Sequence, residues 1–162
     1  MLTIAIVCAV AALSCVLAAA VSDIMRFEIP DGLSIALAAL AIVYGFATPG
    51  FDWLSHVGAA VLVFGVGLFT FARGWMGGGD VKLLTAIAAW TGLHDMLLQL
   101  TATALSGGVL ALVLIAARAG VAVARPGADT TSRLLRKDAP LPYAVAIAAG
   151  TFWWALQAWP LS

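Results

Sequence analysis

Long apolar stretches separated by short polar segments run through the whole chain, and they restrict its possible folds more than any other feature. Hydrophobic residues make up 64% of the 162 residues and charged residues only 10%, whereas a soluble domain usually has roughly 25% charged residues. A helix needs about 20 apolar residues to cross a bilayer. Six stretches are candidates, of which the fourth is short: Leu2–Val21, Leu33–Thr48, Leu54–Ala72, Val81–Leu93, Met96–Ala117 and Leu141–Trp159. The sequence predicts an all-α, polytopic membrane helix bundle of about six transmembrane helices.

The positions of the basic residues predict how this bundle is oriented. All eight lie in or next to the connections that follow the first, third and fifth stretches: Arg26, Arg73, Lys82, Arg118, Arg125, Arg133, Arg136 and Lys137. The opposite connections hold Asp52, His56, His94 and Asp95 instead. Basic residues mark the cytoplasmic side of membrane proteins. We therefore expect both termini to lie outside, in a protein of the inner (cytoplasmic) membrane.

The composition gives no support to a nucleic-acid partner, a disulfide or a metal site. The formal net charge is zero, which gives no indication of a nucleic-acid partner. Cys8 and Cys15 are about 10 Å apart along a helix, too far for a disulfide, and they are expected to be packing residues. No Cys-x-x-Cys pair is present, and no other metal-type ligands cluster near His56 or His94, so we expect no metal site.

The first apolar stretch could be mistaken for a secretory signal peptide, because Ala18-Ala19-Ala20 resembles a cleavage site. However, no Lys or Arg precedes it, and its length is that of a spanning helix. We expect it to be retained, within a single integral membrane domain over residues 1–162.

Two aspartates interrupt the apolar sequence. Asp23 ends the first stretch, and Asp80 follows three glycines at the start of the fourth. A carboxylate near a bilayer costs several kcal/mol unless it is paired, solvated or protonated, so it marks a candidate functional site. In the predicted topology both aspartates reach the cytoplasmic side and can face each other. Two carboxylates that share one proton can activate a water and polarise an amide carbonyl, which is the chemistry of aspartic peptidases.

Structural roles for the two aspartates stay open at this point. Asp80 precedes Val81-Lys82-Leu83-Leu84 and could be the N-cap of a helix. Asp23 could form an interfacial ion pair with Arg26, three residues further on.

Gly77, Gly78 and Gly79 form a further candidate feature beside Asp80. Glycine reaches positive φ easily and allows close approach to its backbone. These residues could therefore hold an extended peptide substrate by strand-like hydrogen bonds, or they could form an ordinary flexible turn. They do not form a phosphate-binding loop, because Lys82 lacks the preceding Gly and the following Ser or Thr.

Two other polar residues near the aspartates are expected to have supporting roles. Glu28-Ile29-Pro30-Asp31-Gly32 is typical of a turn followed by a helix start. Asp31 fits an N-cap there better than a third catalytic acid. Lys82 is expected to extend its ammonium group to the membrane interface. Alternatively, its positive charge could tune the charge of the Asp80 carboxylate, two residues away.

Three segments, taken together, resemble the type IV prepilin peptidases, which are GxGD-type intramembrane aspartic peptidases. Ser22-Asp23-Ile24-Met25-Arg26-Phe27-Glu28-Ile29-Pro30-Asp31 is similar to the family's Asp followed by Ile-Pro-Asn or Ile-Pro-Asp. Gly77-Gly78-Gly79-Asp80-Val81-Lys82-Leu83-Leu84 is close to its GxGD-x-K box. Leu141-Pro142-Tyr143-Ala144-Val145-Ala146-Ile147-Ala148 is similar to its late Pro-Tyr segment.

This resemblance implies that Asp23 and Asp80 are the catalytic pair and that no cofactor takes part. The remaining residues of the motifs then become candidate supporting residues: Gly77, Gly78, Gly79, Lys82, Pro30, Asp31 and Pro142. The implied partner is a prepilin or pseudopilin, with a short basic leader followed by a hydrophobic helix. Such enzymes cut at the cytoplasmic face, usually after a Gly, and leave the helix in the bilayer. An archaeal-type preflagellin peptidase has the same chemistry.

The chain departs from the larger members of this family. It lacks their cytoplasmic insertion with paired Cys-x-x-Cys motifs, so N-methylation is not expected. Its small size is similar to that of the stand-alone peptidases of Flp (tight-adherence) pilus systems. Two alternatives remain: a small proton-coupled transporter or channel that uses the buried acids, and a non-catalytic assembly protein of a secretion system. A transporter favours internal repeats, and none is visible here. The sequence gives no indication of the oligomeric state.

Overall fold

The computed structural model describes residues 2–124 and 140–158, and the regular structure of these residues is entirely helical. The elements are α1 (Leu2–Arg26), α2 (Asp31–Ala47), α3 (Trp53–Ala72), α4 (Gly78–Ala124) and α5 (Tyr143–Ala158). The predicted all-α class is thereby confirmed. Three segments are long and apolar enough to cross a membrane: Leu2–Arg26, Trp53–Ala72 and Gly78–Val121. These three segments agree with a membrane protein. The six membrane crossings and the external position of both termini stay predictions.

The helix boundaries differ from the predicted stretches in two informative ways. The first helix continues past Val21 to Arg26, which places Asp23 inside α1. The predicted fourth and fifth stretches are both parts of α4, divided by a break at Gly92. Trp159 and the basic residues Arg125, Arg133, Arg136 and Lys137 lie outside the described residues.

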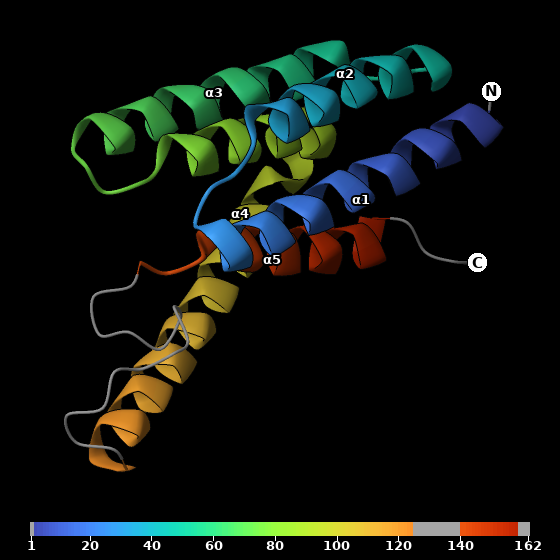
Figure 1. The fold of residues 1–162 in the computed structure, drawn as a ribbon. Helices are drawn as coiled ribbons and strands as arrows, with labels where there is room; N and C mark the ends of the chain where they lie inside the picture. Colours follow the sequence, from blue (N-terminus) through green and yellow to red (C-terminus); the bar gives the residue numbers. More distant parts are fainter. Residues whose placement is uncertain (1, 125–139, 159–162) are drawn as a thin grey trace.

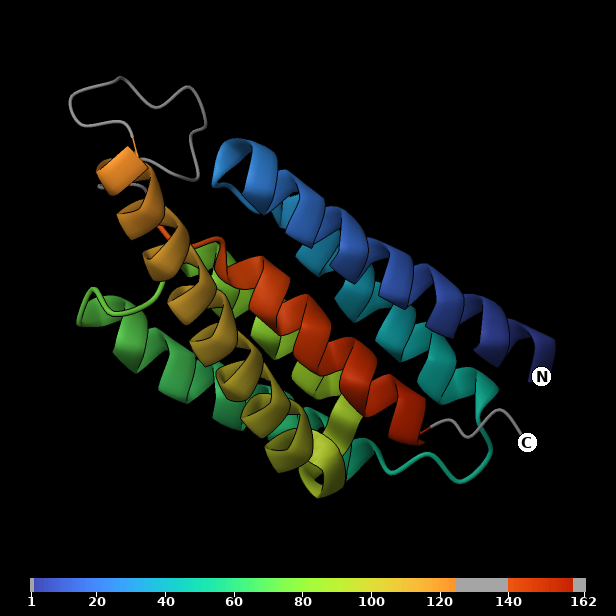
Figure 2. The ribbon, with the colours of Figure 1, turned by 90° about the horizontal axis from the view of Figure 1, so that it is seen from below.

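The helices form a bundle whose two ends carry different connections (Figure 1). The connections from α1 to α2 and from α3 to α4, and the start of α5, lie at one end. The start of α1, the end of α5 and the connection from α2 to α3 lie at the other, as Figure 2 shows from below. Helix α4 packs against α2, α3 and α5, while α1 packs against α2 and α5. The ends of α1 and α3 and the starts of α2, α4 and α5 therefore lie at the same end of the bundle.

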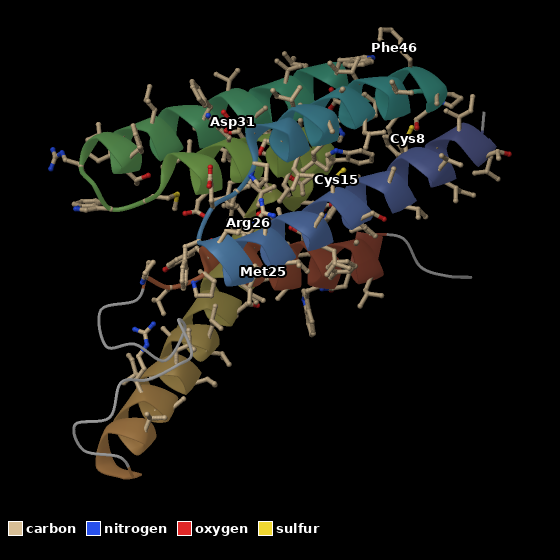
Figure 3. All side chains as sticks on the ribbon, in the orientation of Figure 1. Cys8, Cys15, Met25, Arg26, Asp31 and Phe46 are labelled. Atoms are coloured by element: carbon tan, nitrogen blue, oxygen red, sulfur yellow. The ribbon has the colours of Figure 1, made fainter. Side chains whose placement is uncertain are left out.

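Apolar side chains from four helices fill the centre of the bundle. The most deeply buried are Val16 of α1, Leu37 of α2, Leu83 and Ile87 of α4, and Ile147 of α5. The indole Nε1–H of Trp90 donates a hydrogen bond to the backbone oxygen of Leu37 at 2.9 Å, which joins α4 to α2. Cys8 is buried and Cys15 half-buried on α1, and both are free thiols, as predicted (Figure 3).

Small residues bring α4 close to its neighbours. A Cβ atom on Gly67 of α3 would lie 2.6 Å from Cγ1 of Val81, and one on Gly150 of α5 would overlap Thr103. Beside this second contact, the buried Gln99 donates from Nε2 to Oγ1 of Thr103 at 3.0 Å and of Thr151 at 3.3 Å. Close backbones and inter-helix hydrogen bonds of this kind stabilise helix packing in membranes.

The break in α4 is at Gly92, whose φ of 64° and ψ of 179° are not helical. Residues other than glycine rarely adopt this conformation. The second part of α4 returns from the break toward the end of the bundle at which α4 begins (Figures 1 and 2). A single glycine thus divides α4 into a first part, which contacts α2 through Trp90 and α3 through Val81, and a second part, which contacts α5 through Gln99 and Thr103.

Two side chains of α3 satisfy the backbone groups that this break frees. In an unbroken helix the Leu93 N–H would donate to the Ala89 carbonyl. Here it donates to Oγ of Ser55 at 2.9 Å, and Nδ1 of His56 is 2.9 Å from the Ala89 oxygen. A carbonyl only accepts, so Nδ1 of His56 carries the proton. His56, for which no role was predicted, is thus part of the α3–α4 contact.

We predict that Gly92→Ala lowers the free energy of unfolding by about 2 kcal/mol, the usual size of a strained backbone conformation. The new Cβ would also lie 2.9 Å from Oγ of Ser55 and 3.2 Å from Nε2 of His56. Thermal unfolding of the purified protein in detergent measures the effect. Gly108→Ala is the matched control, because Gly108 is helical with open space around it, and alanine there should be neutral or stabilising. Equal midpoints for the two variants would contradict the role of Gly92.

Candidate active site

Asp23 and Asp80 line the same cavity, at the end of the bundle where α1 ends and α4 and α5 begin. The cavity has a volume of about 410 Å³. Its walls come from the end of α1, the connection before α4, the first turn of α4 and the segment that leads into α5: Asp23, Phe27, Trp75, Met76, Gly77, Asp80, Pro140, Leu141 and Tyr143. The two aspartates singled out from the sequence are therefore brought together by the fold.

The Asp23 side chain is held by the start of α5. It is only 7% exposed, and its Oδ2 accepts a hydrogen bond from the backbone N–H of Ala144 at 2.9 Å. Ala144 is the second residue of α5, so its N–H has no partner within the helix. The positive end of the helix dipole also favours a carboxylate there. Among the residues that the structure describes, Asp23 and Arg26 form no ion pair. The interfacial ion pair that the sequence left open as a role for Asp23 is therefore wrong.

Asp80 lies in the first turn of α4, three residues after Gly77. The Gly77 carbonyl accepts the Val81 N–H at 3.2 Å, and the Gly77 N–H interacts with the Asp80 carboxylate. This is the arrangement of an acidic residue that reaches back to the N-cap of its own helix. Gly77 therefore occupies the N-cap position, and the alternative of Asp80 as N-cap is wrong. A Cβ on Gly77 would lie 2.9 Å from Oδ2 of Asp80, so the carboxylate uses the space that glycine leaves.

The two carboxylates act on each other across the cavity. The charge of Asp23 contributes to the electrostatic environment of Asp80. Their backbone supports come from different helices, Ala144 of α5 for Asp23 and Gly77 before α4 for Asp80. The cavity thus contains two independently fixed carboxylates with space between its walls for other atoms.

Phe27 ends α1 in an unusual conformation beside this pair. Its φ of 55° makes it the one non-glycine residue with positive φ in the described part of the chain. Its N–H donates to the Asp23 carbonyl at 2.8 Å and completes the last turn of α1. Glycine is the usual residue at such a position, and a bulky side chain there is strained. Because strained residues concentrate at functional sites, Phe27, which lines the cavity, joins the candidate site; nothing in its sequence context signalled this.

The three glycines before Asp80 do not have the predicted loop conformation. We expected positive φ among the three glycines Gly77, Gly78 and Gly79. In this connection it occurs at Gly74 instead, so the expectation is wrong. Gly78 and Gly79 are the first two residues of α4. A Cβ on Gly79 would lie 3.1 Å from Cβ of Ile29, and one on Gly78 would lie 3.4 Å from the Phe71 ring. Both glycines thus allow close packing within the protein, while Gly77 lines the cavity.

The supporting residues Pro30, Asp31 and Lys82 lie away from the carboxylate pair. Pro30 occupies the N-cap position of α2 and Asp31 is its first residue, so the expected N-cap at Asp31 is wrong by one residue. Nζ of Lys82 is 2.8 Å from both carboxylate oxygens of Asp31. These two residues line a separate groove between α2, α3 and α4.

The late Pro-Tyr segment does reach the site. Pro142 is buried just before α5, and its carbonyl accepts the Val145 N–H at 3.2 Å. Its neighbours Leu141 and Tyr143, rather than Pro142 itself, line the cavity. Ala144 was missed because its contribution is a backbone N–H, which leaves no pattern in a sequence. Its only signal was its place beside Pro142 and Tyr143.

Residues 2–124 and 140–158 contain no group of three or more His, Cys, Asp or Glu side chains arranged to hold a metal ion. The cavity offers two carboxylates, backbone N–H groups and aromatic walls. Such a set can position a water molecule and transfer protons by itself.

The sequence matches the profile of the type IV leader peptidase family over residues 10–112, a stretch that covers most of the chain and includes Asp23 and Asp80. The chain belongs to this family. A search of curated proteins found no match. A search of solved structures found none either.

Membership of this family makes the protein a protease, and the apolar helices agree with a protein embedded in the membrane. Family membership also disfavours the two alternative functions, a small transporter and a non-catalytic assembly protein.

We predict that Phe27→Gly is more stable than Phe27→Ala by about 1 kcal/mol, because both remove the ring but only glycine relieves the positive φ. Met25, an exposed residue inside α1, is the matched control. There the order should reverse, since alanine favours a helix over glycine by about 1 kcal/mol. Thermal unfolding of the four variants measures both differences. The same order at both positions would contradict the strained end of α1.

Proposed function

We propose that this leader peptidase is an aspartic endopeptidase in which Asp23 and Asp80 activate a water molecule. The observation that carries the proposal is the single cavity lined by both carboxylates, one from α1 and one from α4. The rest of its wall is mostly apolar or aromatic, and a partly water-excluded site strengthens interactions between charged groups. Membership of a peptidase family supports the same chemistry.

In the proposed reaction the two carboxylates hold one proton between them. The ionised one takes a proton from the water as it attacks the peptide carbonyl, and the protonated one donates to the carbonyl oxygen. The Ala144 N–H fixes the orientation of Asp23, and the first turn of α4 fixes Asp80. The site therefore needs no cofactor for hydrolysis.

The proposed substrate is a type IV prepilin or pseudopilin, from which the enzyme removes a short basic leader. The family supports a leader peptide as the substrate class, and within that class we propose the Flp-type precursors. The substrate's hydrophobic helix would stay in the bilayer, while its leader reaches the cavity at the end of the bundle. We expect cleavage without N-methylation.

The proposed location is the cytoplasmic face of the inner membrane. Arg26 ends α1, Arg73 follows α3 and Lys82 lies near the start of α4, all at the end of the bundle that carries the cavity. Arg118 reaches the same region, where its Nη2 is 3.5 Å from the Pro140 carbonyl. Basic residues concentrated at one end support a cytoplasmic position for that end.

We predict that Asp23→Asn and Asp80→Asn each reduce prepilin cleavage by roughly 10²–10⁴-fold, because a lone carboxylate cannot serve as both acid and base. The assay uses purified enzyme in liposomes with a Flp-type prepilin, read by gel shift. Asp52→Asn is the control: Asp52 caps α3 at the opposite end, through a bond of 3.1 Å from the Ser55 N–H, and asparagine caps equally well.

Two outcomes would count against the proposal. Substantial cleavage by either Asn variant would remove the carboxylate pair as the catalytic group. No cleavage by a folded wild-type enzyme, tried with several prepilins, would move support to a transporter or to a non-catalytic assembly protein.

A further inference from the structure

A second hollow lies on the side of α4 that faces α2 and α3. It is a groove of about 340 Å³ that begins at Asp31 and Lys82 and continues between small and apolar side chains. Asp80 and Lys82 are two residues apart on α4, and residues at that spacing point to different sides of a helix. The groove is therefore separate from the cavity of the carboxylate pair, and a substrate bound in it would be held away from Asp23 and Asp80.

The polar end of the groove displays one positive and one negative charge to the surroundings. Nζ of Lys82 is 2.8 Å from Oδ1 and Oδ2 of Asp31, while 52% of the lysine and 63% of the aspartate side chain stay exposed. An exposed ion pair of this kind contributes little stability by itself, so both groups can be shared with a ligand. A ligand that carries a phosphate and an ammonium group would complement the two charges together.

A buried hydroxyl marks the same end of the groove. Ser34 lines it, one turn after Asp31 on α2. Its side chain is only 7% exposed, and its Oγ has no hydrogen-bond partner. A buried polar atom without a partner is unusual in a protein. A polar ligand atom beside Asp31 would supply one.

Beyond these residues the groove is apolar. Alanines from three helices, Ala38, Ala60 and Ala89, leave space along it, and Phe64 forms part of its wall. From Lys82 to Ala89 it follows α4 for about 10 Å, at 1.5 Å per residue. Its charged end lies at the start of α2, which Figure 3 marks by Asp31, at the end of the bundle where basic residues collect. A polar head followed by a hydrocarbon chain matches this order of polar and apolar surface.

We propose that this groove binds one phospholipid with a primary-amine headgroup, of the phosphatidylethanolamine class. Its phosphate contacts Lys82, its ammonium contacts Asp31 and its upper acyl chain lies along the alanines. A quaternary ammonium cannot donate hydrogen bonds to Asp31, and a glycerol headgroup carries no positive charge. The site therefore distinguishes phosphatidylethanolamine from phosphatidylcholine and from phosphatidylglycerol.

Native mass spectrometry of the purified protein tests this. The protein is delipidated in detergent and titrated separately with phosphatidylethanolamine, phosphatidylcholine and phosphatidylglycerol. We expect one tightly bound phosphatidylethanolamine, held at least fivefold more tightly than the other two lipids, and a rise in the thermal midpoint with that lipid only. Equal binding of the three lipids would mean non-specific surface lipid and would overturn the proposal.

Three variants locate the site. Asp31→Asn should abolish the preference for phosphatidylethanolamine over phosphatidylcholine, and Ala60→Leu should displace the lipid by filling the groove. Ala104→Leu is the matched control, because Ala104 is exposed on α4 outside the groove, and it should bind the lipid as the wild type does. Retained preference in Asp31→Asn, whose charge change needs no repacking, would overturn the proposal even if Ala60→Leu fails to fold.

Discussion

The break at Gly92 is the constraint on which the positions of the other helices depend. Gly92 is buried, and buried backbone groups that lose a helical hydrogen bond need another partner in its place. Ser55 and His56 supply these replacements from α3. The first part of α4 contacts α2 through Trp90 and α3 through Val81, while the second part contacts α5 through Gln99. The contact with α5 supports the position in which the Ala144 N–H meets Asp23.

Asp23 and Asp80 consequently have structural contacts as well as a proposed chemical role. The Asp23 carboxylate accepts a hydrogen bond from the N-terminal turn of α5, and the Asp80 carboxylate interacts with Gly77 before the first turn of its own helix. A carboxylate that is fixed by backbone groups has few orientations, which is useful when two such groups must act on one water. The contacts that hold the pair leave the cavity side open to other atoms.

Much of the fold could be predicted from the sequence because apolar length and interrupting charges are strong signals. The helical class and the cores of most helices followed from the apolar stretches, and Asp23 and Asp80 stood out as carboxylates in hydrocarbon. The break at Gly92 could not be placed, since its stability depends on Ser55 and His56 in a distant segment. Gly78 and Gly79 were expected in a loop because glycine reaches positive φ easily; here they begin α4, and Ile29 and Phe71 occupy the space that side chains would need.

The details of the candidate site were less predictable for a related reason. Ala144 acts through its backbone, and the conformation of Phe27 is imposed by the end of α1 and its surroundings rather than by its own preference. Lys82 was expected to extend to the membrane interface or to influence Asp80, yet its ion-pair partner is Asp31 on another helix. Contacts between helices decide the roles of Ala144 and Lys82, and a single sequence does not show such contacts directly.

The tight reversal in α4 also affects how the orientation of this protein can be mapped in cells. Reporter domains and epitope tags are tolerated at exposed connections, and the reversal has no such connection, because the residue that departs from helical geometry there is the buried Gly92, with helix on both sides. The connection between α2 and α3 lies at the same end of the bundle and exposes Pro49 and Gly50, the latter in a turn with φ of 75°. A tag inserted there reports the side of the membrane on which both α3 and the second part of α4 begin.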